Sequence, residues 1–586
     1  LLFIVAVASV FVSAVVRAEP IVPDELPQDV GVFIESPDIN TAATELQKFV
    51  SQVAPGAMIP APGMMLPQFA FKTTQPNTVD LSKPLQMIVL LPPLHEQPAV
   101  IFSVTDKDAY LGSIALPKKE TDGNLHIFQG RGPDFIVAVE GKRAVMSPSR
   151  EVARKVAGML ADGKFGAERL LPEGHIALAV RPAAAMPKLR EAGMDPFGLI
   201  RQQMQAQAAM AGQEGVQEAM KVADIQLQAF QNLLEQTRGL TIAVEFSEQA
   251  VVFHDRAQAV EGSGLAAYFE SIPGGEMETL GHMPADAMAF YATKFGDLKP
   301  AFNWARAAVN EADLQKEGLD EVFGVMENWL NAIGNEVSQA AAVTEGGKIS
   351  AVGAMTMKDT ANIGELLKGA GEMARAMTPM QNLPNAPKIE TTVTPNAQTY
   401  NGVQLHEMAM KVELPEPGPN MPAQAVAMQR AMFDLFGGTD STSYSAIVDG
   451  DYIYTQGAGS LEAMKATIDR DPGLAGADVL QTAQEHAGQN AVLIGFVSVA
   501  DAVNFALDYA AQKMGQNAPP PLQNIRMQAA DPLTFSSGVL PDSVATFKMT
   551  FPVSIAKSGF QAAMQFQQAM QGGAGGGAPG RGPMLP

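Results

Sequence analysis

The sequence predicts an α+β protein in two homologous halves, made mainly of antiparallel sheets with helices packed on one face. Apolar runs of strand length are joined by short glycine-containing turns, as around Gly141, which predicts hairpins. Segments with helical spacing lie between the hairpins, which favours the α+β class. One turn–strand–turn–helix unit, LPEGHIALAVRPAAAMPKLREAG from Leu171, recurs at Leu26, Met283 and, without its proline, at Asn490. This recurrence indicates a chain built by duplication.

The first half alternates strand and helix patterns. Apolar residues occupy every second position of 240–246, which is typical of a strand with one buried face. Ser147 is expected to cap a helix, because Pro148 suits the first helical position. Residues 54–80 are expected to be loop. The expected strands are 30–35, 87–91, 100–104, 135–139, 144–146, 176–180, 240–246 and 250–254, and the expected helices are 43–53, 148–160, 214–235 and 262–270.

The second half repeats this order. A hairpin is expected about Asp449-Gly450-Asp451, followed by a helix capped by Ser460, as in the first half. Residues 544–553 are matched with 240–246. Residues 349–357 predict a strand, 363–377 a helix, and 378–400, rich in proline, asparagine and threonine, a linker. Two such halves fit either two sheets packed side by side or one continuous sheet.

The N-terminal residues predict a secretory signal peptide. An apolar run is followed by Val16-Arg17-Ala18, which suits cleavage after Ala18. The alternative is an uncleaved anchor, for which the run is short. No later segment is apolar enough to cross a membrane, so no span is expected in the mature chain. The expected organisation is a signal peptide (1–18), a first half (19–275), a second half (276–571) and a disordered glycine- and proline-rich tail (572–586).

Composition excludes several classes of function. Lysine and arginine number 40 against 62 aspartates and glutamates, and this net charge of −22 repels nucleic acid and anionic lipid. The chain has no cysteine, which excludes disulfides, thiol catalysis and thiolate metal sites. An exported protein without disulfides fits the bacterial periplasm or cell envelope.

Catalytic motifs are nearly absent. No nucleophile elbow, Walker A loop or dinucleotide fingerprint occurs. Ser554 and Lys557 form an SxxK pattern, but without the companion motifs of serine acyltransferases. The His-Glu pairs at 95–96 and 406–407 lack the second histidine of a zinc motif. These residues are the first suspects if the protein is a hydrolase.

Metal and cofactor sites are not predicted. Asp449 and Asp451 lack an EF-hand loop around them, so they are interpreted as turn residues. Methionines at 373–380 and 428–432 have no nearby histidine or cysteine, which favours an adaptable core or an apolar binding face over a copper site. No catalytic residue, metal ligand or cofactor is assigned.

The openings at Leu26 and Met283, together with VEGKRAVMSPSREVARKV at 139–156, resemble large exported proteins of planctomycete-like bacteria and exported bacterial domains that begin with similar LPxD strands. The resemblance covers most of residues 26–571. It implies an envelope-associated protein without an assigned activity, and it transfers no functional residue.

Three hypotheses of function follow. The first is an exported, non-enzymatic component of the cell envelope that binds a partner or serves a structural role. The second is a hydrolase whose site is assembled from distant residues. The third is a carrier of an apolar ligand between the two halves, which would need an apolar cavity. The sequence does not identify the ligand, the partner or the oligomeric state.

Overall fold

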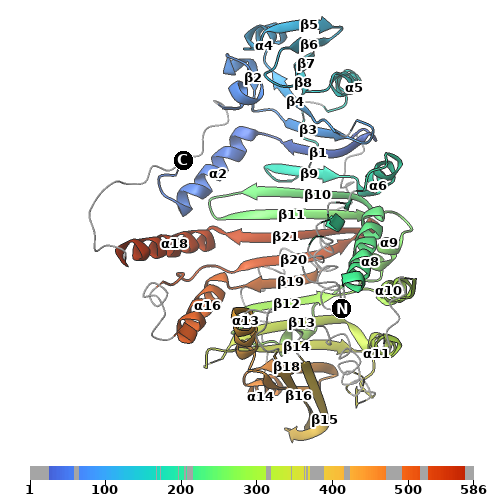
Figure 1. The fold of residues 1–586 in the computed structure, drawn as a ribbon, viewed down its shortest axis with the longest axis vertical. Helices are drawn as coiled ribbons and strands as arrows, with labels where there is room; N and C mark the ends of the chain where they lie inside the picture. The colour runs from blue at the N-terminus through green and yellow to red at the C-terminus, as the bar shows by residue number, and fades with distance from the viewer. Residues whose placement is uncertain are drawn as a thin grey trace.

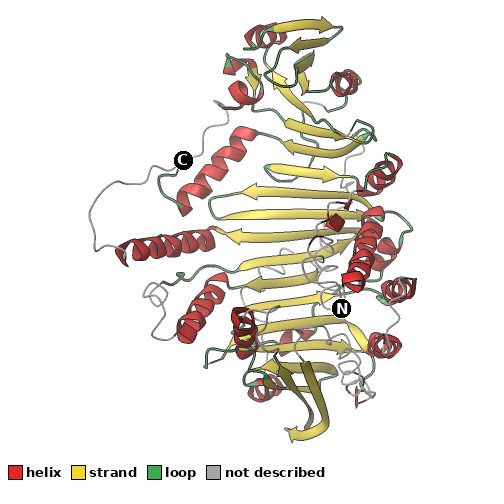
Figure 2. Ribbon diagram, in the orientation of Figure 1, coloured by secondary structure: helices red, strands yellow, loops and turns green. Residues whose placement is uncertain are grey.

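A computed structural model describes residues 26–573 with gaps, the longest of which are 58–64, 207–215, 312–318, 370–387, 415–422, 470–490 and 515–524. The expected signal peptide, the methionines at 373–380 and nearly all of the expected tail lie outside the described residues. The described chain is α+β, as predicted. Figure 1 and Figure 2 show one long stack of strands with helices along both ends of the strands.

All strand pairings are antiparallel, and they join the described strands into one open sheet. The strands before the middle of the chain are β1 (Val30–Ser36), β2 (Val79–Asp80), β3 (Leu85–Leu90), β4 (Ala99–Val104), β5 (Lys118–Asp122), β6 (Leu125–Phe128), β7 (Phe135–Glu140), β8 (Arg143–Ser147), β9 (Ile176–Val180), β10 (Thr237–Phe246) and β11 (Ala250–Ala259). The later strands are β12 (Ala289–Lys294), β13 (Ile333–Val343), β14 (Ile349–Met357), β15 (Lys388–Tyr400), β16 (Val403–Glu413), β17 (Asp440–Val448), β18 (Asp451–Gly457), β19 (Ala491–Val497), β20 (Leu533–Leu540) and β21 (Val544–Pro552).

The strands are connected along the chain in the same pattern whether the sheet is followed inward from one end or from the other. From one end it runs β5-β6-β7-β8-β4-β3-β1-β9-β10-β11. From the other it runs β15-β16-β17-β18-β14-β13-β12-β19-β20-β21. The two runs meet where Ala250–Gln258 of β11 pair with Val544–Pro552 of β21. The short β2 pairs with β4. The two halves therefore share one continuous sheet.

Helices flank the sheet along both ends of the strands. In Figure 1, α2, α13, α16 and α18 lie along one end of the strands, and α6, α8, α9, α10 and α11 lie along the other. The helices are α2 (Ile39–Val53), α4 (Lys107–Ser113), α5 (Arg150–Ala161), α6 (Pro182–Glu191), α8 (Val216–Glu235), α9 (Gly264–Glu270), α10 (Lys299–Glu311), α11 (Leu319–Ala332), α13 (Ala423–Leu435), α14 (Ser460–Ile468), α16 (Val499–Met514) and α18 (Val553–Gly573).

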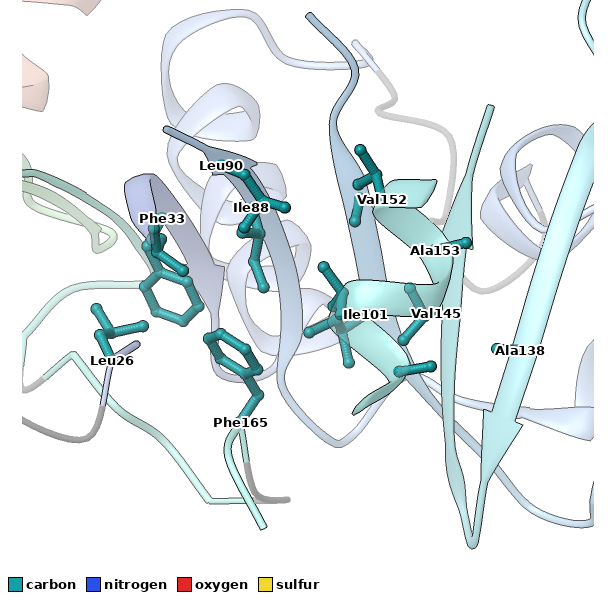
Figure 3. Close-up of a cluster of buried hydrophobic side chains, with 14 of the residues drawn as sticks. Leu26, Phe33, Ile88, Leu90, Ile101, Ala138, Val145, Val152, Ala153 and Phe165 are labelled. Atoms are coloured by element: carbon teal, nitrogen blue, oxygen red, sulfur yellow. The ribbon is translucent and has the colours of Figure 1, made fainter. Parts of the chain in front are cut away.

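The largest cores lie toward the two ends of the sheet. In the first half, Val152 and Val156 of α5 pack on Ile101 and Val145 of the sheet, and all four are at most 1% exposed. Figure 3 shows this cluster, in which Phe33 stacks on Phe165. In the second half, α14 packs in the same way on β14, β17 and β18, with Met464 fully buried. The middle of the sheet lies between these cores.

The predicted hairpins are confirmed, with two-residue turns at Gly141-Lys142 and Asp449-Gly450. Gly141 has φ 58° and Gly450 has φ 95°, which glycine adopts without strain. Both predicted helix caps are wrong by one or two residues. Ser149 caps α5, because its hydroxyl accepts from Val152 N at 3.3 Å while Ser147 ends β8. Gly459 in a left-handed conformation precedes α14, and the hydroxyl of Ser460 donates to Thr442 O.

Two other expectations fail. The expected linker 378–400 contains β15, a strand of thirteen residues that pairs with β16 on both sides of a bulge at Asn396. The alternation of Ile389, Thr391 and Val393 outweighs the local turn residues. The match of 544–553 with 240–246 is also displaced, because β21 and β10 occupy different places in the strand order. β20 holds the place equivalent to that of β10. The helix expected at 363–377 lies mostly outside the described residues.

Two glycines make room for aromatic rings in the second half of the sheet. A Cβ on Gly353 would collide with the ring of Tyr454, and one on Gly495 would collide with the ring of Phe535 and lie 2.6 Å from Phe290 O. We expect Gly495→Ala to lower the free energy of unfolding by about 2 kcal/mol, because backbone and ring must both move. Urea unfolding measures this. As a control, Gly158→Ala in α5, where a Cβ meets nothing within 4 Å, should raise stability by up to about 1 kcal/mol. A stable Gly495→Ala protein would contradict the packing.

Candidate functional site

The middle of the sheet has two unlike faces. In antiparallel pairs, residues directly opposite each other project on the same face, so the registers of β9, β10, β11, β21 and β20 assign each side chain. On one face, called the closed face here, the side chains are small or polar. Those of Ala177, Ala243, Thr534 and Ser536 are at most 8% exposed. Small side chains are therefore the buried ones at this part of the sheet.

The opposite face, called the open face, carries the large apolar side chains. Six of them form what we call the central patch, and all are half-buried: Leu178, Ile242, Phe253, Phe547, Met549 and Phe535. Ile176, beside the patch on β9, is 38% exposed. This reverses the usual arrangement, in which a sheet buries its apolar face. Large apolar side chains that stay partly exposed side by side on a sheet make this face a candidate binding surface.

Helices cover the open face at both ends of the strands. At one end, Leu533 and Phe551 pack in a cluster with residues of α16 and α18. At the other end, Val539, Ala545 and Ala259 pack in a cluster with α9. In Figure 1 the strands that carry the central patch run between the helices at one end and those at the other. Its five strands, spaced about 4.8 Å apart, make a floor roughly 19 Å across.

One ionisable side chain lies in this apolar floor. Asp255 of β11 is directly opposite Ile242 of β10 on one side and Phe547 of β21 on the other. Burial raises the pKa of the Asp255 carboxyl to about 6, and no charged neighbour contributes to that change. A carboxyl whose pKa is raised by an apolar environment is a marker of functional sites.

The closed face carries an ionic cluster at the same place. Glu173 contacts both Arg256 and His254, the latter at 3.8 Å, and Glu245 lies 3.5 Å from the Nε2 atom of His254. Burial lowers the pKa of His254 and that of Lys548, its direct neighbour on β21. The imidazole is therefore neutral at pH 7, and two cations face two carboxylates.

This cluster joins the loop before β9 to the central strands. Its charges balance, and in the described chain no serine or threonine hydroxyl bonds to His254. Acid–base catalysis needs a proton donor or acceptor within hydrogen-bond reach of a reacting group. We therefore interpret the cluster as a structural link between the loop before β9 and the strands β10 and β11.

The SxxK pair does not form the arrangement that a serine nucleophile needs. Ser554, at the start of α18, donates its hydroxyl to the carboxylate of Asp531 at 3.0 Å and accepts from the backbone N of the same residue at 3.1 Å. Lys557 is exposed. The hydroxyl proton is thus directed to Asp531 and not to the lysine.

The His-Glu pairs are also not brought together. His95 lies outside the described residues. His406 accepts from Asn396 N at 3.2 Å, and burial lowers its pKa. Glu407, the next residue of β16, accepts from the hydroxyl of Tyr444 at 3.1 Å on the other face of the sheet. Each side chain of the 406–407 pair is therefore held by its own structural partner.

The two aspartates of the Asp449-Gly450-Asp451 turn have structural roles. Asp451 pairs with His282 at 3.1 Å, and Asp449 is a turn residue with φ 53°. The side chains of Met428 and Met432 are outside the described residues. Across the described part of the chain, no three histidine, aspartate or glutamate side chains are placed to share a metal ion.

Two surface hollows lie away from the central patch. One of about 350 Å³ at the start of α14 is lined by glycines and polar residues, among them Gly459 and Glu462. The other, of about 360 Å³, lies between Leu94 and α5. Neither is the apolar cavity between halves that the carrier hypothesis requires. Within the described helices, no stretch combines the length and the apolarity that a membrane crossing requires.

Sequence reasoning missed the central patch and Asp255. A signal for the patch was present, because Ile242 and Phe246 alternate with Thr241 and Glu245 along one strand. That alternation defines two faces but does not say which one the rest of the chain covers. Asp255 interrupts an apolar alternation in β11, and such an interruption is the signal to look for.

Comparisons with known proteins add a distant structural likeness. No protein-family model and no curated protein matches the chain. Two crystal forms of the Treponema protein TP0453 resemble it. Form I is 8% identical, with 42% of this chain and 81% of that chain covered and a TM-score of 0.20. Form III is 5% identical, with 49% and 99% covered and a TM-score of 0.22. The resemblance is structural and of low TM-score.

Proposed function

We propose that this protein is an exported, non-enzymatic component of the cell envelope that acts by binding, and that the central patch is its binding surface. The observation that carries the proposal is the reversed burial in the middle of the sheet. There the large apolar side chains are half-buried and the small ones are covered. Covering the patch with an apolar ligand would release free energy at about 25 cal/mol per Å² of apolar surface removed from water.

Export is supported by the N-terminal sequence and by composition. The apolar run before Ala18 and the cleavage pattern are those of a signal peptide. The absence of cysteine is compatible with a compartment in which thiols would be oxidised. The strand order supports the origin by duplication that the repeated unit suggests, with halves at 19–275 and 276–571. Each strand of one run has a counterpart at the same place in the other, and the short β2 belongs to neither run.

Binding of a neutral apolar probe tests the proposal. The chain from residue 19 onward should raise the fluorescence of Nile red in a saturable titration. The double substitution Phe253→Gln and Phe547→Gln should weaken that binding by roughly tenfold or more, because each lost phenyl contact costs on the order of 1 kcal/mol. Both rings are on the open face, in adjacent strands.

The matched control is Thr546→Gln, the neighbour of Phe547 on the closed face, which should leave Nile red binding unchanged. Thermal unfolding of each variant verifies that the fold is retained. Absence of Nile red binding by the native protein would contradict the proposal, and so would full-strength binding by the folded double variant.

A further inference from the structure

The surroundings of Asp255 define what kind of ligand suits the central patch. A row here means residues that lie directly opposite one another on adjacent strands. The row that contains Asp255 is Leu178, Ile242, Asp255, Phe547 and Ser537. The next row on the open face contains Val244, Phe253, Met549 and Phe535, and the row on the other side contains Leu240, Ala257, Ala545 and Val539. The carboxyl is therefore bordered by apolar residues in every direction along the sheet.

Asp255 has no ionic partner among the described residues. Its sequence neighbours His254 and Arg256 project from the closed face, where they pair with Glu173. From β10 and β21, the elements that flank β11, the directly opposed side chains are Ile242 and Phe547. A carboxylate in an apolar surface is costly unless it is paired. A ligand that covers this surface must therefore either bring a cation or leave the carboxyl protonated.

We infer that the ligand of the central patch is a cationic amphiphile, whose apolar chain lies on the patch and whose amine pairs with Asp255. This inference rests on the proposed function of the patch. Charge complementarity carries it, because the one ionisable group in the floor is acidic and the chain as a whole has a net charge of −22. An anionic amphiphile of the same length would bring a second negative charge into the floor, which is unfavourable.

Three ligands of equal chain length test the inference: decylamine, decanol and sodium decanoate. Each is titrated into the mature chain at pH 8 by isothermal calorimetry, below its aggregation concentration. We expect decylamine to bind roughly tenfold more tightly than decanol, because a hydrogen bond between charged groups is worth about 1.5 kcal/mol or more. Decanoate should bind more weakly than decanol.

The variant Asp255→Asn should bind decylamine no more tightly than decanol, and it should bind decanol at least as tightly as the native protein does, because the ligand then covers no carboxylate. The matched control is Glu245→Gln, which removes a carboxylate from the neighbouring strand but on the closed face. This control should keep the preference for the amine.

The outcomes separate this inference from the proposed function. Equal binding of decylamine and decanoate by the native protein would overturn the inference, and so would an unchanged amine preference in Asp255→Asn. Both results would leave the proposed function standing, because an apolar ligand is still bound. If none of the three ligands binds and Nile red does not bind, the proposed function fails and the inference fails with it.

Discussion

Replacing Asp255 by asparagine should raise the free energy of unfolding by roughly 2 kcal/mol at pH 7.5 and have little effect at pH 4. Burial raises the pKa of this carboxyl from 3.8 to about 6 in the folded protein. The folded state thus binds the proton more tightly than the unfolded state does. The stability of the native protein should therefore fall as pH rises from about 3.8 to about 6, and the loss should be complete above that range.

Urea unfolding of both proteins between pH 4 and pH 7.5 measures this difference. The full gap between the two pKa values corresponds to about 3 kcal/mol, which partial exposure of the group reduces. Glu261→Gln, which changes an exposed carboxyl just beyond β11, is the control and should run parallel to the native protein. Parallel curves for Asp255→Asn and the native protein would show that the carboxyl is not in an apolar environment.

Glu35→Ala should destabilise the protein by about 3–5 kcal/mol, the largest effect expected of a single substitution discussed here. Glu35 of β1 is fully buried on the closed face of the sheet, where it lies directly opposite Ala177 of β9. Its carboxylate accepts from the side-chain amide of Gln86 at 2.8 Å and from the backbone N atoms of Leu170 and Leu171 at 2.9 and 2.7 Å. Gln86 in turn accepts from Arg143. Alanine would leave all these donors unpaired in the interior.

Urea unfolding also measures this effect, with Glu45→Ala as the control. Glu45 lies on α2 and pairs with Lys48 at 2.9 Å on the surface, so its loss should cost less than about 1 kcal/mol. Glu35→Gln keeps an acceptor oxygen and should lie between the two. Equal stability of Glu35→Ala and Glu45→Ala would show that the buried hydrogen bonds of Glu35 contribute little.

Local features of the fold could be predicted because local residues determine them. The hairpins at Gly141 and Gly450 need a positive φ, and glycine at those positions indicates it. The start of α5 was misplaced because Ser147 and Ser149 are both good caps, and the end of β8 decides between them. The pairing of β11 with β21 had no local signal, because it joins residues near the middle of the chain to residues near its end.

The candidate site could not be predicted from the sequence for a related reason. Periodicity assigns Ile242 and Thr241 to opposite faces of a strand, and the usual inference places the larger apolar residue inward. Which face is covered depends in part on where α16 and α18 pack, and these helices follow β19 and β21, which are distant from β10 in sequence. The motifs that sequence did highlight, Ser554 with Lys557 and His406 with Glu407, have local structural partners instead.

The seam between β11 and β21 also sets the order in which the chain can fold. During synthesis, the first run of strands can pair completely up to β11, whose outer backbone groups then have no partner until the last strand of the sheet emerges. An unpaired strand edge is a template for association with other chains. Closure of the seam is a long-range step, which makes it slow relative to the hairpins on either side. β11, the strand that carries Asp255, is thus the strand whose edge stays unpaired for the longest time during synthesis.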